Sequence, residues 1–194
     1  TEGWIYSSGN NISRVTKRDV LIADDFKKFI VDTNPDLTED EVTQIFDNVR
    51  LVGSESDFAT LHKVYGWMVN GIQFTPQDGI ARMIPLIDFK KDSNKNIFRV
   101  VNQFTVEYTN NGQKENRRPD VLLFVNGMPL CVIELKNPAD ANATIYDAWE
   151  QINIRYWRDI PHLLHYCTLA CISDGVKTRL GTVHTPYEHF YAWR

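Results

Sequence analysis

Two carboxylates and a lysine stand at the ends of two apolar segments that a tight turn separates. Asp120 directly precedes the apolar run 121–125, while Glu134 and Lys136 follow the apolar run 130–133. Carboxylate oxygens are ligands that Mg²⁺ prefers, and Mg²⁺ can activate a water and neutralise the charge of a phosphate. A lysine beside such anions keeps its proton, so it can orient the water or stabilise charge on the phosphate. The three residue types therefore fit the hydrolysis of a phosphodiester.

The element that must bring these groups together is a β-hairpin. Asn-Gly at 126–127, between two apolar runs, is a strong hairpin signal. With a two-residue turn and no irregularity, Asp120 and Glu134 would lie on opposite faces. Cross-strand partners share a face, so the carboxylates converge only if one extra residue is accommodated by a three-residue loop or a β-bulge. Pro129 has no N–H to donate and favours such an irregularity. We predict Asp120 opposite Glu134.

The motifs of this region resemble those of a known nuclease family. Pro-Asp at 119–120, a hairpin and Glu-x-Lys at 134–136 resemble the PD-(D/E)xK nuclease core. The run 118–138 is similar to the N-terminal nuclease domain of the R (motor) subunit of type I restriction enzymes. Asn-Gln-Phe at 102–104 and Ser-Asp-Gly at 173–175 also fit that family.

The resemblance implies a Mg²⁺-dependent endonuclease domain that hydrolyses double-stranded DNA. Asp120 and Glu134 would bind the metal, with the main-chain carbonyl of Leu135 as a further ligand. Lys136 would assist the water and the phosphate. The adjacent pair Arg117-Arg118 would contact phosphates of the DNA backbone.

A helix after the hairpin supports the site in the family that this chain resembles, through a Gln-x-x-x-Tyr motif. Apolar spacing here predicts a helix over 141–158, in which Gln151 is the supporting residue. Tyr156 lies one residue beyond the spacing of that motif. Either a residue is inserted, or the tyrosine is displaced by about 100° around the helix. The alternative interpretation of Gln151 is a surface helix residue.

The wider chain suits one globular domain, with 194 residues of which 43% are hydrophobic and 24% charged. We expect an α/β fold, a restriction-endonuclease-like (PD-(D/E)xK) mixed central sheet flanked by helices. Residues 1–80 would form a mainly helical accessory part, and residues 81–194 the nuclease core. Apolar spacing and a capping box predict helices over 18–33, from 38 onward and over 56–69. Alternation predicts a strand over 97–108, and polarity predicts a loop over 109–116.

Charge and composition narrow the classes of function. The formal net charge of −4 argues against a free-standing, high-affinity nucleic-acid binder but suits an acidic metal site within a larger machine. Three cysteines without zinc spacing favour reduced thiols in a cytoplasm, and no apolar run is long enough for a transmembrane helix.

The sequence contains no phosphate-loop motif, so no ATP binding through such a loop is expected. The resemblance assigns ATP to a motor absent from this chain, and implies methyltransferase and specificity subunits as partners.

Other polar residues are weaker candidates for the site. Asp88 lies near the predicted strands, where it could join the site or cap a turn. We interpret the acids of the predicted helix starts as solvated surface residues: Asp24, Asp25, Asp40 and Glu41. His162 and His165 have no matching ligand set, and Mg²⁺ prefers oxygen, so we interpret them as core or surface histidines. The aromatic segment 187–194 predicts exposed apolar surface.

The first residues suggest a fragment of a longer subunit. The chain opens on Thr1 rather than Met, and Gly-Trp stands at positions 3–4. In the family that it resembles, a helix with a further acidic ligand commonly precedes such a pair, so we expect that helix upstream of Thr1. Two other hypotheses remain: a non-catalytic assembly or docking module with a nuclease fold, and another PD-(D/E)xK nuclease such as a repair enzyme.

Overall fold

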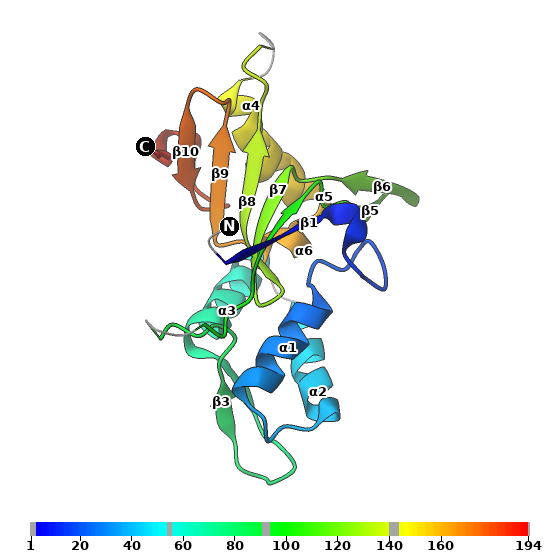
Figure 1. The fold of residues 1–194 in the computed structure, drawn as a ribbon. Coiled ribbons are helices and arrows are strands. Elements are labelled where there is room, and N and C mark those ends of the chain that lie inside the picture. Colours follow the sequence, from blue (N-terminus) through cyan, green and yellow to red (C-terminus); the bar gives the residue numbers. More distant parts are fainter. Residues whose placement is uncertain (1–2, 54–55, 91–93, 140–143, 194) are drawn as a thin grey trace.

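A seven-stranded mixed sheet forms the centre of the molecule (Figure 1). The computed structural model describes residues 3–53, 56–90, 94–139 and 144–193. In spatial order the strands are Trp4–Ser8 (β1), Phe98–Asn102 (β4), Val121–Val125 (β7), Met128–Leu135 (β8), Leu169–Ser173 (β9), Thr178–Gly181 (β10) and Tyr191–Ala192 (β11). β1 is parallel to β4 and β8 to β9, whereas the other neighbours are antiparallel. The predicted mixed α/β architecture is confirmed at this level.

Helices and two small β-ribbons surround this sheet. The N-terminal part contributes Ala23–Thr33 (α1), Glu39–Arg50 (α2) and Asp57–Asn70 (α3). The C-terminal part contributes Ile145–Glu150 (α4), the π-helical turn Gln151–Tyr156 (η2), Trp157–Asp159 (α5) and Pro161–Leu164 (α6). The ribbons are Ile72–Phe74 (β2) with Arg82–Ile84 (β3), and Val106–Asn110 (β5) with Gln113–Arg117 (β6). Short 3₁₀ turns lie at Gly9–Asn11 (η1) and Tyr187–His189 (η3).

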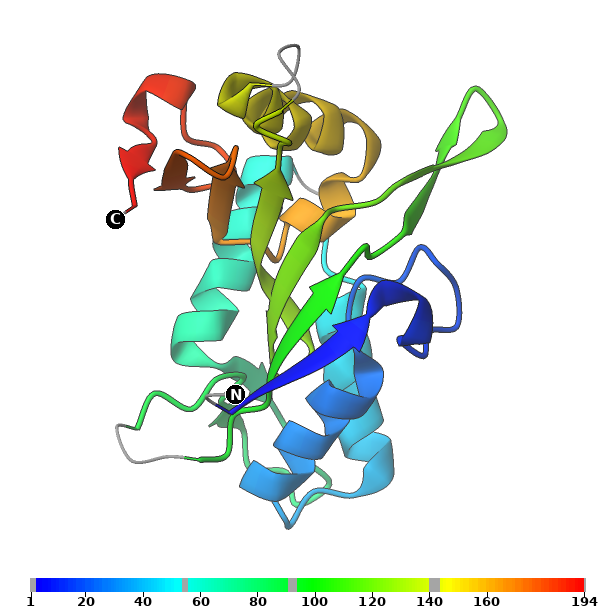
Figure 2. The ribbon, with the colours of Figure 1, turned by 45° about the horizontal axis from the view of Figure 1, so that its top comes forward.

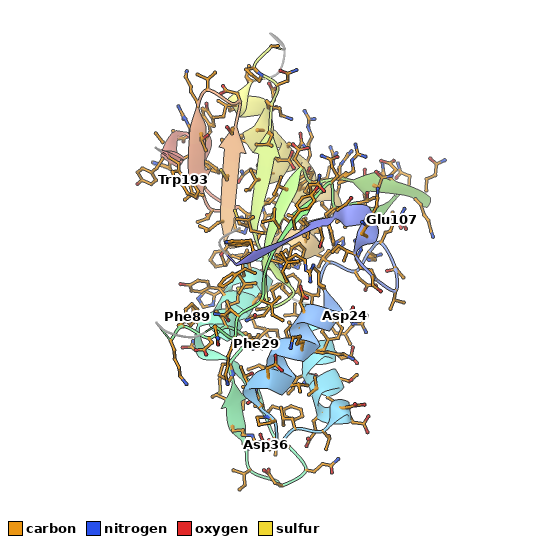
Figure 3. The ribbon with its side chains drawn as sticks, viewed as in Figure 1. Asp24, Phe29, Asp36, Phe89, Glu107 and Trp193 are labelled. Atoms are coloured by element: carbon orange, nitrogen blue, oxygen red, sulfur yellow. The ribbon has the colours of Figure 1, made fainter. Side chains whose placement is uncertain are left out.

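One hydrophobic core joins the N-terminal helices to the sheet. Phe26 and Ile45 of the helices belong to the same buried cluster as Leu122 and Val132 of the central strands. In Figure 3, Phe29 lies among the helices, whereas Trp193 lies at the surface near the C-terminus. Tyr191 and Trp193 are both well exposed, which confirms the apolar surface predicted for the last segment.

Several predicted boundaries are wrong for identifiable reasons. α1 begins at Ala23 because the preceding residues are extended and buried, and the N–H of Ile22 donates to the carbonyl oxygen of Gly127 at 2.9 Å. The strand predicted over 97–108 is two strands, because Gln103 between them has φ 53°. The loop predicted over 109–116 is the β5–β6 hairpin. The start of the helix predicted over 141–158 lies outside the described residues.

Two of the four helix-start acids are buried, so the interpretation as solvated residues is wrong for them. Asp25 pairs with the guanidinium of Arg99 at 2.6 Å. Glu41 completes the capping box of α2 and accepts the N–H of Gln77 at 2.8 Å. Both carboxylates have hydrogen-bond partners, as burial of an acid requires. Asp24 and Asp40 are exposed, as interpreted.

Candidate active site

The β7–β8 hairpin combines a two-residue turn with one β-bulge. The strands pair directly across 126–127, but the register shifts by one residue in the middle of β7. Beyond the bulge Val121 pairs with Ile133, and the same register extended by one residue places Asp120 opposite Glu134. This confirms the predicted alignment, and a bulge rather than a longer loop supplies the extra residue.

The turn anchors the hairpin at its other end. Asn126 and Gly127 have φ 50° and 77°, as a type I′ turn requires. The buried amide of Asn126 accepts the N–H of Ile97 at 2.8 Å and donates to the carbonyl oxygen of Leu86 at 2.9 Å. A Cβ on Gly127 would lie 2.3 Å from the carbonyl oxygen of Ile22. The turn therefore holds both strands firmly against the core.

Both oxygens of the half-buried Asp120 carboxylate have partners. Oδ2 accepts the main-chain N–H of Leu135 at 2.9 Å, and Oδ1 accepts Nε2 of Gln103 at 3.0 Å. The carboxylate thus bridges β8 and the end of β4. Asp88, a weaker candidate for the site, does not lie beside Asp120. Its N–H donates to Asn96, and Asn96 contacts the turn residue Asn126 at the opposite end of the hairpin. Asp88 accepts the N–H of residue 90 and so caps a turn.

Glu134 is fully buried, and two side chains from one helical segment hold it. Oε1 accepts the hydroxyl of Tyr156 at 2.6 Å, and Oε2 accepts Nε2 of Gln151 at 2.7 Å. Burial raises the pKa of Glu134 to about 8. The hydrogen bond from Tyr156 and the charge of Lys136 oppose that rise in pKa, while the charge of Asp120 adds to it.

The side-chain amide of Gln151 links Glu134 to Lys136. Its Oε1 accepts Nζ of Lys136 at 2.6 Å while its Nε2 donates to Glu134. Because both ends of the amide are used, Gln151 fixes the relative position of Glu134 and Lys136. Gln151 is therefore not a free surface residue; it contacts the predicted site residues Glu134 and Lys136.

The π-helical turn settles the position of Tyr156. An α-helix would place residues five apart on different faces, whereas i→i+5 bonding brings them onto one face. Gln151 and Tyr156 are the first and last residues of this turn, and Nε2 of Gln151 lies 2.8 Å from the Tyr156 hydroxyl. An inserted residue, rather than a displaced tyrosine, therefore explains the spacing. Tyr156 is buried, and burial raises its pKa.

Gln103 is a residue of this cluster that the sequence did not single out. It is the only non-glycine residue with positive φ outside a two-residue hairpin turn among those that the structure describes. Its N–H donates to the carbonyl oxygen of Asp120 at 2.8 Å, in addition to the amide contact with the carboxylate. A Cβ on Gly9 would lie 2.4 Å from the carbonyl oxygen of Gln103. The only signal for Gln103 in the sequence was its place in the Asn-Gln-Phe segment.

The two predicted phosphate contacts have different surroundings. The guanidinium of Arg117 pairs with the buried carboxylate of Asp159 at 2.6 Å, which ties β6 to α5. Arg118 is exposed. Of the two, Arg118 is the more accessible to a phosphate.

The histidines lie apart from this cluster. Burial lowers the pKa of His162 to about 4, so this ring is neutral near pH 7. Nε2 of His165 lies 2.8 Å from a carboxylate oxygen of Asp57. In the described part of the chain, no three His, Cys, Asp or Glu side chains converge as a metal group.

The donor set of the cluster fits a divalent cation such as Mg²⁺. The ion needs only one or two carboxylates when waters and substrate oxygens complete its shell. Each oxygen of Asp120 and Glu134 accepts one hydrogen bond and keeps a second lone pair. The N–H of Leu135 points to Asp120, and its carbonyl points to the same side of the strand. Burial raises the pKa of Glu134, and a divalent cation beside it would favour the charged form of this carboxyl group.

Comparison with known proteins identifies relatives over nearly the whole chain. Residues 1–189 match the family described as Type I restriction enzyme R protein N terminus. A putative type I restriction enzyme MjaIXP endonuclease subunit of Methanocaldococcus jannaschii is 33% identical over 201 residues, covering 98% of this chain. The type I restriction enzyme HindI endonuclease subunit of Haemophilus influenzae is 30% identical over 206 residues, covering 99% of this chain. The chain spans 19% of the length of each of these curated relatives.

Proposed function

Because the chain belongs to the family of type I restriction enzyme R protein N termini, we propose that it is the Mg²⁺-dependent endonuclease domain of a type I restriction–modification R subunit, with a PD-(D/E)xK nuclease fold. The relatives are named endonuclease subunits. The observation that supports the proposal most is the convergence of Asp120, Glu134 and Lys136 at the ends of two adjacent strands. Gln151 joins Glu134 to Lys136, and the main-chain N–H of Leu135, which lies between those two residues, joins Asp120 to the same strand.

Each residue of the cluster has a role in this proposal. Asp120 and Glu134 would hold the cation with the carbonyl of Leu135. When bound, Mg²⁺ would neutralise charge on the phosphate and lower the pKa of a water. Lys136 presents a protonated ammonium, which stabilises charge on the phosphate or orients the water. Gln151 keeps that ammonium at a fixed position beside Glu134.

The substrate and the partners are part of the same proposal. Double-stranded DNA is the substrate, and methyltransferase and specificity subunits complete the complex. Since the chain covers 19% of its relatives, we assign ATP-driven DNA translocation to the remaining part of the subunit. No helix in the described ranges is long and apolar enough to cross a membrane.

Alanine variants of the full-length protein test the proposal in its restriction complex. Asp120→Ala and Lys136→Ala should each reduce DNA cleavage by about 10²-fold or more, because each removes a charged group from the reacting centre. Asp40→Ala and Lys63→Ala are matched controls, since both charges are exposed and lie on the N-terminal helices. Unchanged cleavage by the first pair would refute the proposed active site. Assembly of the complex and ATP hydrolysis should be unaffected in all four variants.

A further inference from the structure

Exposed cations gather on the β5–β6 hairpin and on the loop before α1. Lys17 and Arg18 belong to the loop, Lys114 to β6, and Arg118 follows β6 directly. All four side chains are exposed, and none takes part in an ion pair with another described residue. These four residues form what we call the cationic edge. It lies on a chain whose formal net charge is −4, so it departs locally from the overall charge.

The loop and the hairpin form one continuous surface. The N–H of Glu107 on β5 donates to the carbonyl oxygen of Lys17 at 3.0 Å. A shallow groove between the two segments is lined by Thr16, Arg18, Glu107, Tyr108, Thr109 and Lys114. Cations from segments about a hundred positions apart in the sequence thus face the same groove.

The acids of this region are matched by other groups. The negative charges of Asp19 and Glu107 interact with the positive guanidinium of Arg14. Arg14 is half-buried and donates to the carbonyl oxygen of Thr105 at 2.9 Å. Glu115 accepts the hydroxyl of Tyr108 and an amide N–H of Asn110, and these bonds lower the pKa of Glu115. These carboxylates stay anionic, but among the described residues none of them forms an ion pair with a cation of the edge. The four exposed cations therefore remain available to an external anion.

The hairpin is fixed relative to the candidate active site. Figure 2 shows it projecting away from the central sheet, where it continues into β7. Arg117 at the end of β6 pairs with Asp159, and Asp159 lies on α5, directly after the π-helical turn that carries Gln151. Arg118 stands two residues before Asp120. A ligand held on the hairpin would thus be placed at a defined position beside Asp120.

We propose that the cationic edge binds the phosphate backbone of double-stranded DNA, so that the duplex runs along the β5–β6 hairpin toward Asp120. The inference rests on the proposed function and names the surface by which that site receives its substrate. Ammonium and guanidinium groups bind phosphates without reading sequence, and a two-stranded ribbon is an established DNA-contacting element. Binding at this surface is therefore independent of sequence and strongly dependent on salt.

Crosslinking in the full-length protein tests the surface directly. A photoreactive benzoyl-phenylalanine replaces Lys114 on the hairpin or, as control, Lys63 on α3, and the probe is a labelled random 40-base-pair duplex without Mg²⁺. Crosslinking from position 114 should exceed that from position 63 by at least about tenfold at low salt, and should fall steeply as salt rises. Equal yields at the two positions would overturn the proposal.

A charge-matched pair of triple variants gives the second readout. K17A/R18A/K114A removes three cations of the edge, and K28A/K63A/K90A removes three exposed cations elsewhere. Only the first should lower the slope of log K against log salt for duplex binding, by about 0.9 for each phosphate that the protein no longer neutralises. If the edge variant keeps its DNA affinity but loses complex assembly, the surface binds an acidic protein and the proposal is wrong. Because these measurements need no Mg²⁺, they stay independent of the cleavage test with Asp120→Ala.

Discussion

Gln103 offers a test of whether the site needs its side chain or its backbone conformation. Its φ of 53° lies in the left-handed region, which costs a non-glycine residue about 1 kcal/mol relative to glycine. Its amide donates to the Asp120 carboxylate at 3.0 Å, and a hydrogen bond to a charged group contributes about 1.5–3 kcal/mol. Alanine removes the amide and keeps the strain, whereas glycine removes both.

The two variants should therefore differ in stability but not in function. Gln103→Ala should lower the free energy of unfolding by about 1.5–3 kcal/mol. Gln103→Gly should recover about 1 kcal/mol of that loss. In both, Asp120 loses the same donor, so the affinity of the site for Mg²⁺ and the rate of DNA cleavage should fall to a similar degree, by about tenfold for 1.4 kcal/mol.

Urea unfolding followed by tryptophan fluorescence measures the stability, and titration with Mg²⁺ measures the site. Asn111→Gly is the matched control, because Asn111 has φ 48° in the β5–β6 turn and contacts no residue of the cluster. It should leave Mg²⁺ affinity unchanged. Normal cleavage by Gln103→Gly with impaired cleavage by Gln103→Ala would refute a role of the amide, and would assign the effect to backbone strain.

Three further substitutions test other parts of the structure. Tyr156→Phe removes the hydroxyl that donates to Glu134 at 2.6 Å and should cost about 1–3 kcal/mol in urea unfolding, with loss of cleavage. Gly127→Ala should cost at least about 2 kcal/mol, because φ is 77° and the new Cβ would lie 2.3 Å from a main-chain oxygen; an unchanged unfolding midpoint would contradict the anchored turn. Hydrogen bonds from Arg158 are the largest cause of the lowered pKa of Asp159. The stabilisation of the fold by the ionised Asp159 is therefore fully present above the pKa of this residue in the unfolded chain, about 4, and is lost as the pH falls through its pKa in the folded protein. Asp159→Asn should accordingly flatten the decline of stability below about pH 4 in unfolding measured across a pH series.

The hairpin at the centre of the site could be predicted from sequence because the alternation of side chains along its strands limits which residues can share a face. Asn-Gly defines the turn, and side chains alternate strictly along each strand. Across a two-residue turn, partners are separated by an odd number of positions, whereas Asp120 and Glu134 are separated by an even number. Their pairing therefore required one irregularity, and the bulge is that irregularity. Gln151 was also predicted, although only through the family motif.

The rest of the site depends on contacts that a sequence pattern does not encode. The residues around Gln103 alternate well enough for one long strand, yet Gly9 packs against its carbonyl and the chain turns there. The β5–β6 hairpin was missed for a different reason. Its polar residues favoured a loop, although Asn-Gly at 111–112 is the same turn signal that succeeded at 126–127.

Glu134 lies between two single-residue irregularities, and each solves a separate geometric problem. Without the bulge in the hairpin, Asp120 would point to the other face of the sheet. Without the π-helical turn, Tyr156 would lie about 140° around the helix axis from Gln151, so only one of the two could contact the acid. A bulge leaves one residue outside the ladder, and a π-turn departs from the preferred helical bonding, so neither is favoured by local structure alone. Their joint presence around one buried carboxylate with a raised pKa is better explained by selection for the position of that carboxylate than by selection for stability.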